Sequence, residues 1–293
     1  MGLRIRTNIA SVNAQRNLGN STNALGEDMA KLSSGYRINK SADDAAGLAI
    51  SETLKAKTRS LEQAKRNAND GVSLIQTAEG SMNEVSNILV RLRELATQAS
   101  SDTIGNKERS YTNREYVQLV NEIQRISNTT NYNGTPLLSG SEAAGDESMF
   151  IIHVGAGDGL TENTDTIRIG TENLKISIEE MGLGTQSEIG PMEDGEAFTR
   201  ETAASKLTVL DNALQLVASN RAYLGAQQSR LNSTINNLGV QTENMKSTNS
   251  RIRDVDFADV TASFTQNKIL QQAGASVLAQ ANSSPEIALA LLR

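Results

Sequence analysis

Residues that could carry out chemistry are few in this chain, and they form no catalytic pattern. His153 is the only histidine, and there is no cysteine. A zinc protease of the His-Glu-x-x-His type needs two histidines on one helix face, and thiol catalysis, disulfides and cysteine-bound zinc all need cysteine. No nucleophile motif surrounds His153, so we interpret it as a structural residue of a strand. The sequence predicts no catalytic residue, no metal site and no cofactor, and therefore a protein that is not an enzyme.

The acidic residues nearest to a ligand-binding pattern gather in one turn-rich segment, at Asp158, Glu162, Asn163 and Asp165. A calcium loop needs several oxygen ligands at fixed spacing, and these four do not follow the spacing of an EF-hand. We interpret the segment as a solvated hairpin loop.

Two further charged clusters lie near the expected ends of helices. Ser41 to Asp44 precede an apolar run, which predicts Ser41 as an N-cap with an acidic residue in the first helical turn. We expect Asp43 and Asp44 to act in helix capping and subunit contact rather than as a catalytic pair. The second cluster consists of Arg251, Arg253, Asp254 and Asp256. We expect it to be solvated, and between copies of the chain it would form ion pairs that depend on pH and salt.

Composition limits the function classes that remain. The net charge of −6 argues against nucleic-acid binding, which needs clustered Lys and Arg to neutralise phosphates. No run approaches the roughly 18–20 apolar residues that span a bilayer, and the first eight residues lack the apolar core of a secretory signal. We therefore expect no membrane insertion. Aromatic residues make up only 3% and tryptophan is absent, which suits long coiled coils better than a compact globule.

The three prolines, Pro136, Pro191 and Pro285, mark the boundaries between larger elements. Residues 1–135 and 192–284 contain none. Because a proline inside a helix costs roughly 3 kcal/mol, both proline-free arms can form very long helices. They are joined by a short Gly- and Asp-rich middle segment.

A seven-residue apolar repeat runs through the C-terminal arm. Alternating steps of three and four from Leu207 to Ile252 reach fourteen positions, of which ten are apolar, and this pattern is typical of a coiled-coil seam. As one helix, residues 201–253 would extend about 80 Å.

The N-terminal arm carries a second seam, from Leu61 to Ala99, with many small residues that let a partner helix approach closely. A third, shorter run extends from Tyr116 to Ile126. Asn133-Gly134 and the following proline predict a turn after that helix. Short strands are predicted at residues 149–154, 166–169 and 174–178.

These elements predict a mainly α fold: a long antiparallel coiled-coil helical bundle with a small β-hairpin region, in which the N- and C-terminal helices are paired. We expect two domains. Residues 1–42 with 255–293 form a terminal-helix domain. Residues 43–254 form a coiled-coil core domain that includes the hairpin region at about 140–200, with no large outer domain. Periodicity alone also fits three core helices of an unrelated soluble bundle.

Both terminal segments are amphipathic. Such helices are marginal alone in water, so they either pack on each other or stay mobile until other copies bury them. Head-to-tail stacking of copies would generate an open helical filament. The residues predicted to form this polymerisation interface are Ile5, Ile9, Val12, Leu18, Leu25, Met29, Leu32, Phe257, Val260, Phe264, Ile269, Leu270, Val277, Leu278, Leu289, Leu291 and Leu292.

Several strings of residues together resemble bacterial flagellin, the subunit of the flagellar filament. The resemblance covers about residues 1–140 and 200–293. The strings that carry it are Thr7–Leu18, Leu32–Asn39, Asp43–Ile50, Asn69–Gly80, Arg91–Ala99, Ile269–Asn282 and the final Leu291-Leu292-Arg293.

The resemblance implies a terminal-helix domain that lines the inner tube of the filament and a coiled-coil core domain outside it. It further implies export in an unfolded state by the flagellar type III apparatus, without a cleaved signal peptide, to the extracellular filament. The implied partners are other copies of the chain, a cap protein, hook-junction proteins and a cytoplasmic export chaperone.

In the family, an Arg-x-Arg-Glu-Leu motif and an Asn-Glu-Ile motif contribute to recognition by vertebrate Toll-like receptor 5. The matching residues here are Arg91, Leu95 and Glu122. The resemblance therefore implies recognition of the monomer by this receptor, although the same residues would also serve packing.

We conclude from the sequence that the chain is a structural subunit that self-assembles into the bacterial flagellar filament for swimming motility. A hook–filament junction protein of the same superfamily is an alternative, although it would lack so close a match in the last forty residues. A non-flagellar coiled-coil scaffold or adhesin is a third interpretation. Such a protein would not need the matching sequence strings at both ends of the chain.

Overall fold

The computed structural model describes residues 8–139, 149–157, 164–171, 174–184 and 200–290. It is mainly helical, with small antiparallel β-elements, so the predicted fold class is confirmed. The chain divides into two compact units. The first comprises Met1–Thr58 with Glu243–Arg293, and the second comprises Arg59–Thr242. The predicted domain boundaries, near residues 42 and 255, lie inside the first unit and stay a prediction.

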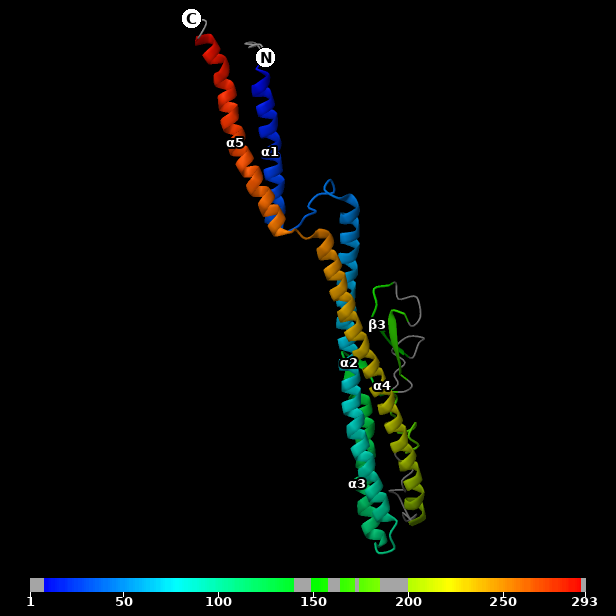
Figure 1. Cartoon of the computed structure of the whole chain (residues 1–293). Coiled ribbons are helices and arrows are strands. Elements are labelled where there is room, and N and C mark those ends of the chain that lie inside the picture. The colour runs from blue at the N-terminus through cyan, green and yellow to red at the C-terminus, as the bar shows by residue number, and fades with distance from the viewer. Residues whose placement is uncertain (1–7, 140–148, 158–163, 172–173, 185–199, 291–293) are drawn as a thin grey trace. The chain divides into compact units, whose positions relative to one another are not determined.

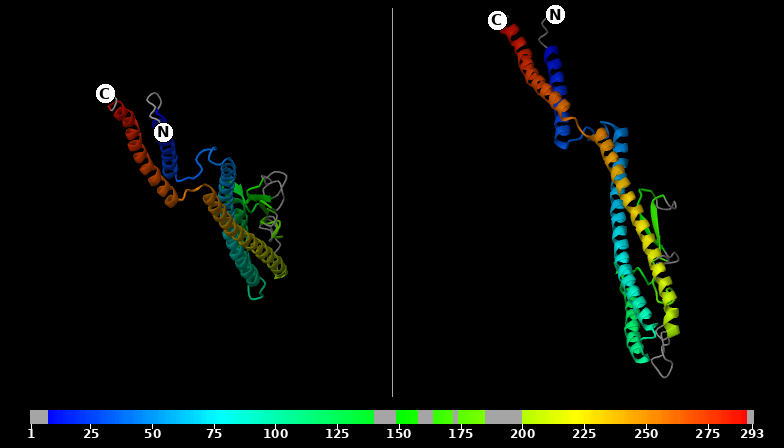
Figure 2. Two further views of the ribbon diagram at one scale, coloured as in Figure 1. Left: turned by 45° about the horizontal axis from the view of Figure 1, so that its top comes forward. Right: turned by 60° about the horizontal axis from the view of Figure 1, so that its bottom comes forward.

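In the first unit, helix α1 (Ile9–Ser34) packs along helix α5 (Phe257–Ala290). The two run antiparallel, as all views show (Figures 1 and 2). Asn8 caps α1, since its side-chain oxygen accepts from the backbone N–H of Ser11 at 3.1 Å. Gly35 ends the helix with a φ of 73°, a left-handed conformation that glycine adopts without steric cost.

The start of helix α2 (Ala45–Ala99) corrects the predicted cap. The side chain of Asp44 accepts from the backbone N–H of Gly47 at 2.8 Å, so Asp44 is the N-cap and Ser41 is not. Only the residue directly before the first turn can reach its free N–H groups, and Ser41 lies too early. The Asp43 carboxylate accepts from the N–H groups of Lys40 and Asn39, and these bonds lower its pKa.

Arg253 ends helix α4 (Arg200–Arg253) and is more enclosed than the sequence predicted. Its guanidinium donates to Glu52 Oε1 at 2.7 Å and lies 4.6 Å from the centre of the Tyr36 ring. The Arg253 side chain is only 18% exposed, so the expectation that this whole cluster is solvated is wrong for Arg253. Asp256, from the same cluster, accepts from the backbone N–H of Ala258 at 2.9 Å in the first turn of α5.

The second unit has an apolar core built by α2, helix α3 (Asn106–Thr129) and α4. All twelve positions of the seam predicted between Leu61 and Ala99 are buried. On α4, every second seam position from Leu210 to Leu238 is buried, at intervals of seven residues, while the intervening seam positions are half-buried. Each fully buried large apolar side chain stabilises the fold by roughly 1.5–3 kcal/mol, so this seam accounts for the cohesion of the second unit.

The turn between α2 and α3 is held by a buried arginine. Arg109 is 8% exposed and donates to the carbonyl oxygens of Ala99 and Ser101, both at 2.9 Å, and to Asn106 Oδ1 at 3.2 Å. A cation at the C-terminal end of α2 also complements the negative end of the helix dipole.

Two short hairpins follow α3. Strands β1 (Asn131–Tyr132) and β2 (Thr135–Pro136) are joined by Asn133 and Gly134, with φ values of 51° and 82°. Positive φ at both central residues defines a type I′ hairpin turn, which confirms the turn predicted there.

Strands β3 (Met149–His153) and β4 (Thr166–Gly170) pair antiparallel, with Met149 opposite Gly170. A Cβ atom on Gly71 of α2 would lie 2.4 Å from Cδ1 of Ile152. Glycine at this position therefore permits the close approach of the hairpin to α2.

The third predicted strand, at residues 174–178, is wrong. Leu174, Ile176 and Ile178 are buried, but the segment pairs with no strand among the described residues, and Ile176 N–H donates to the carbonyl of Leu138 at 2.9 Å. The alternating apolar residues cover the core of the second unit as irregular chain. Alternation of apolar and polar residues indicates which side chains are buried, but it does not specify a neighbouring strand for hydrogen bonding.

Candidate subunit-interaction surface

The apolar residues predicted at the polymerisation interface fall into two groups on α1 and α5. One group is half-buried in the structure: Leu18, Leu25, Leu32, Val260, Phe264 and Leu278. The other group is exposed by 47–62%: Ile9, Val12, Met29, Phe257, Ile269, Leu270 and Val277. Ile5, Leu291 and Leu292 lie outside the described residues, as does the side chain of Leu289.

Three residues of the exposed group form a continuous patch on α5 together with Ala273. Ile269, Leu270, Ala273 and Val277 have the spacing i, i+1, i+4 and i+8, which places them on one side of a helix. All four are exposed. Their neighbours Gly274 and Leu278 are half-buried, and a Cβ atom on Gly274 would lie 3.8 Å from the Cβ of Leu18. One side of α5 therefore contacts α1 while this adjacent apolar side is uncovered.

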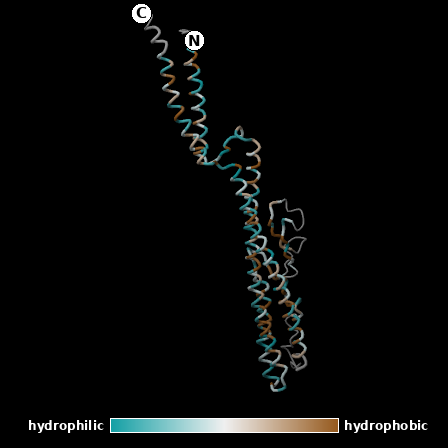
Figure 3. The backbone as a smooth tube through the Cα atoms, in the orientation of Figure 1, coloured by the Kyte–Doolittle hydropathy of each residue, from teal (hydrophilic) through white to brown (hydrophobic). Residues whose placement is uncertain are grey.

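Helix α5 is unusual in how little charge it carries. Its 34 residues include only three ionisable side chains, Asp259, Lys268 and Glu286. Figure 3 shows hydrophobic segments recurring along the helix. A helix that is apolar on more than one side is normally buried on more than one side, and α1 covers only one of them.

The seam between α1 and α5 includes buried polar contacts, which the sequence analysis missed. The most buried side chains of α1 are Ser11, Ala14 and Asp28, each at most 9% exposed. Asn267 Nδ2 donates to Asp28 Oδ2 at 2.9 Å, and Ser11 Oγ donates to Asn282 Oδ1 at 2.7 Å. Counting apolar positions could not find these residues. Ser11 and Asp28 are separated by two heptads and a step of three, so both lie at seam positions. This spacing alone is only a weak sequence signal for a polar contact.

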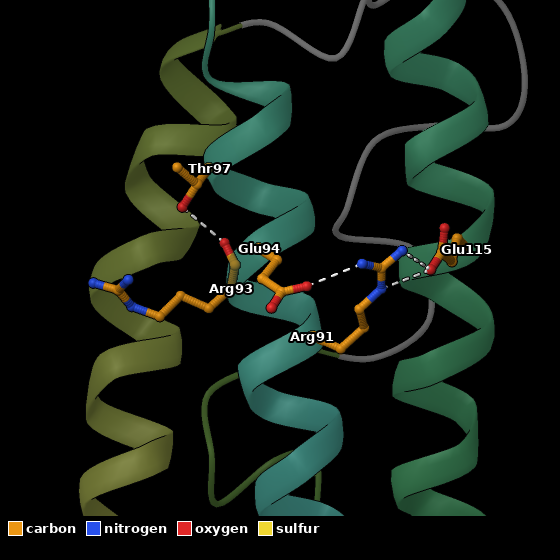
Figure 4. A network of polar contacts seen from close by, with 5 residues as sticks. All are labelled: Arg91, Arg93, Glu94, Thr97 and Glu115. Atoms are coloured by element: carbon orange, nitrogen blue, oxygen red, sulfur yellow. Dashed lines mark hydrogen bonds and ion pairs between the residues drawn. The ribbon is translucent and has the colours of Figure 1, made fainter.

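The residues matched to receptor recognition lie on the second unit, in different environments. The exposed Arg91 donates to Glu115 Oε1 from Nε at 3.0 Å and from Nη2 at 2.9 Å, and to Glu94 from Nη1 at 2.9 Å (Figure 4). The hydrogen bond that Arg91 donates to Glu115, followed by the one that it donates to Glu94, raises the pKa of Arg91. Leu95 is 2% exposed, so its side chain supports this surface from beneath.

Glu122 lies on α3 and is held by a second ion pair. Its Oε1 and Oε2 accept from Nη2 and Nε of Arg125 at 2.6 and 2.7 Å, and the bond from Arg125 lowers the pKa of Glu122. Arg91 and Glu122 thus both present charge that is already paired within the chain.

The residues considered for metal or catalytic chemistry have structural surroundings. The backbone oxygen of His153, in β3, accepts from Asn67 Nδ2 at 3.0 Å. A Cβ atom on Gly155 or Gly157 would collide with the Asp165 carboxylate, which therefore lies against this turn. Asp158, Glu162 and Asn163 lie outside the described residues. Within the described ranges, His, Cys, Asp and Glu side chains do not gather in groups of three or more that could hold a metal ion.

None of the helices in the described part of the chain has the length and hydrophobicity to cross a membrane.

Residues 5–143 match the bacterial flagellin N-terminal helical region, and residues 207–292 match the bacterial flagellin C-terminal helical region. These two matches include the terminal helices and all but the first seven residues of α4.

Full-length relatives agree with these matches. The chain is 42% identical to a flagellin of Halalkalibacterium halodurans over 290 residues, which is 99% of both chains, and 39% identical to the flagellin of Bacillus subtilis over 316 aligned residues. The fold is also shared with a hook-associated protein of Vibrio parahaemolyticus, at 14% identity, a TM-score of 0.56 and coverage of 72% of this chain and 100% of that one. The chain therefore belongs to the bacterial flagellin family and is a structural subunit of the flagellar filament that serves motility.

Proposed function

We propose that copies of this chain join through the outward apolar sides of α1 and α5. The seven exposed residues of the predicted interface, four of them on α5, would be buried against neighbouring copies, while the six half-buried residues hold α1 and α5 together. The observation that carries the proposal is the uncovered patch of Ile269, Leu270, Ala273 and Val277 beside the α1 contact.

The energetics favour a surface that is stable only when it is covered. Burial of apolar surface contributes about 25 cal/mol per Å², so every exposed Ile, Leu, Val or Phe of α5 favours association. A large contiguous apolar patch on a soluble chain normally marks an interaction site. If the patch contacts a different surface of the next copy, the contact is head-to-tail, and head-to-tail contacts whose rotation does not close make a helical filament.

Two substitutions of equally exposed residues test this proposal. Ile269 and Val240 are both 59% exposed on helices, but only Ile269 belongs to the proposed surface. We expect Ile269→Asp to abolish salt-induced or seeded polymerisation, because it would bury a carboxylate without a partner. Val240→Asp should leave polymerisation near wild type. Electron microscopy of both variants measures the result, with circular dichroism as a check on folding. Normal filaments from Ile269→Asp would refute the proposal.

The same α5 surface would also serve the family's other contacts. We propose that an export chaperone covers it in the cytoplasm before export, and that cap and hook-junction proteins meet it at the filament ends outside the cell. An apolar helix side with few charges would otherwise be exposed to non-specific association at every stage before assembly. Ile269→Asp should weaken chaperone binding in a pull-down, and Val240→Asp should not.

Recognition by Toll-like receptor 5 is a second proposed function, favoured by the exposed Arg91 held between Glu94 and Glu115. A guanidinium fixed in this way is preorganised for a carboxylate or carbonyl of a partner. We expect Arg91→Ala to reduce receptor activation by purified monomer, while Arg66→Ala, on the same helix, should not. An unchanged response of the Arg91 variant would remove this proposal.

A further inference from the structure

The apolar residues of α1 do not define how α1 is aligned along α5. Leu18, Leu25 and Leu32 recur every seven residues and are all half-buried. A slip of one heptad would place one leucine of α1 where another had been, although the α5 residues that they face, Val260, Asn267, Gly274 and Ala281, are not alike. A coiled-coil seam with such a repeat needs a polar feature that occurs once to select its register.

Asp28 and Asn267 provide a feature of this kind. Asp28 is 9% exposed, and its carboxylate accepts the Asn267 side-chain amide at 2.9 Å. A slip of seven residues in either direction would bring Asp28 opposite Val260 or Gly274, and neither has a side-chain donor. The buried carboxylate would then lose its partner, which is much more costly than a change of apolar neighbour.

A second polar contact near the chain ends has the same property. Ser11 Oγ donates to Asn282 Oδ1 at 2.7 Å, and Asn8 Nδ2 donates to the carbonyl of Ala281 at 2.7 Å. One heptad away from Asn282, the chain has Ala275 and Leu289, which offer Ser11 no side-chain acceptor. The two polar contacts therefore prefer the same register, at opposite ends of the helix pair.

We propose that the Asp28–Asn267 pair, supported by Ser11–Asn282, maintains the register of the terminal helices beyond their junction, where Val255 N–H donates to the carbonyl of Gly35 at 3.0 Å. The register decides which apolar residues of α1 lie beside Ile269, Leu270 and Val277, and so it sets the composite surface available to the next copy. This consequence for assembly rests on the function proposed above. The role of the polar pair in aligning α1 with α5 does not.

Engineered cysteines can report the register directly, because the chain has no cysteine of its own. The Cβ separation of 3.8 Å between positions 18 and 274 falls within the range of about 3.5–4.5 Å for disulfides. Leu18→Cys/Gly274→Cys therefore reports the native register. Leu18→Cys/Ala281→Cys reports a one-heptad slip, since these positions are otherwise about 10 Å apart along the helix.

The test compares the yields of the two disulfides under mild oxidation, on the soluble chain and on filaments. With Asp28 and Asn267 present, we expect the native-register disulfide to exceed the slipped one by tenfold or more, as loss of about one charge-assisted hydrogen bond implies. In the Asp28→Leu/Asn267→Leu background, the ratio should fall toward one. The exchanged pair Asp28→Asn/Asn267→Asp should keep the native preference, and so should the exposed control Asn13→Leu.

An unchanged ratio in the Leu/Leu background would overturn the proposal. If that variant aggregates, Asp28→Ala and Asn267→Ala each remove one partner, and an unchanged ratio in both would overturn it equally. Measurement on the soluble chain makes the ratio independent of polymerisation. A normal ratio together with filaments from Ile269→Asp would therefore refute the proposed interface alone.

Discussion

Two antiparallel helix pairs in this chain differ in the residue types that they bury between the helices. Between α2 and α4 of the second unit, the buried positions are filled by Leu, Met, Val, Ile and Ala, and charged residues such as Arg93 and Asp211 pair at the exposed margin, 2.7 Å apart. Between α1 and α5, the best-buried positions of α1 include Ser11 and Asp28, while Ile269 and Val277 face outward. The first arrangement buries its own apolar residues, whereas the second leaves apolar residues exposed, which we propose that other copies cover.

The largest difference in the effect of a substitution on stability is expected between two leucines, one in each helix pair. Leu89 is fully buried and Leu270 is 47% exposed. Leu89→Ala should lower the free energy of unfolding by about 2–5 kcal/mol because it leaves a cavity, whereas Leu270→Ala should change it by under about 0.5 kcal/mol. Denaturant titration measures both values. Equal losses of stability would mean that the two pairs are not built differently. Polymerisation should show the reverse order, with the larger defect in the Leu270 variant.

Tyr116 tests how strongly the core of the second unit is shielded from solvent, since its side chain is buried. Burial raises the pKa of its hydroxyl to about 12, above an ordinary value near 10. Between these two values the unfolded chain releases a proton that the folded chain retains, so stability falls as pH rises through this window, by about 2–3 kcal/mol in total. Tyr116→Phe should remove this slope in unfolding experiments between pH 10 and 12. The exposed control Tyr111→Phe should not, and equal slopes would contradict the assignment.

Arg109 tests whether the α2–α3 turn depends on the buried guanidinium. Arg109→Ala leaves the carbonyl oxygens of Ala99 and Ser101 without this donor, and we expect a loss of about 1–3 kcal/mol in the free energy of unfolding. Arg109→Lys should recover only part of it, because one ammonium cannot reproduce a planar set of donors. Full recovery by lysine would show that charge alone stabilises the turn.

Glycines on the long helices give a smaller contrast. Gly225 of α4 has open space where a Cβ would lie, whereas the Cβ at Gly71 would lie 2.4 Å from Ile152. Gly225→Ala should stabilise the chain by about 0.5–1 kcal/mol through reduced backbone entropy of the unfolded state. Gly71→Ala should gain less or lose stability, because Ile152 must move. Thermal unfolding of both variants would show a difference in Tm, and identical shifts would mean that the hairpin does not restrict position 71.

The smallest expected effect concerns Glu52 in the first unit. The hydrogen bond from Arg253, followed by the charge of Lys55, lowers the pKa of Glu52. The contact therefore contributes at pH values above the ordinary pKa of glutamate, and the contribution disappears as the pH falls through the lowered pKa. Glu52→Gln should weaken the acid sensitivity of the region around Tyr36, as followed by amide NMR signals of residues 35–39. An unchanged titration there would show that other carboxylates control this region.

The sequence predicted the second unit well because its physics is simple. A seam of apolar residues every three and four positions leaves little choice of buried side, and the bounds of α4 differ by one residue from those predicted. The turn at Asn133-Gly134 was also readable, because few residues tolerate positive φ. The segment at 174–178 was not, since burial without a ladder has the same apolar alternation as a strand.

For the terminal helices, the sequence identified the apolar residues but not which of them are covered within the chain. Apolar counting selected Leu18 and Ile269 alike, although one faces α5 and the other is exposed. The contacts that separate the two roles, such as Asp28 with Asn267, join residues 239 positions apart. No local pattern encodes such a pair. Leu95 shows the same limit, because a motif match alone does not reveal that a side chain is buried.

Hydrogen exchange of the intact chain, as monomer and as filament, measures whether assembly covers the apolar side of α5. We expect amides around Ile269–Val277 to exchange much more slowly in the filament than in the monomer, because neighbouring copies would cover them. Amides around Met82–Leu92 should be well protected in both states. Unchanged exchange at Ile269–Val277 on assembly would contradict the claim that this side of α5 joins the subunits.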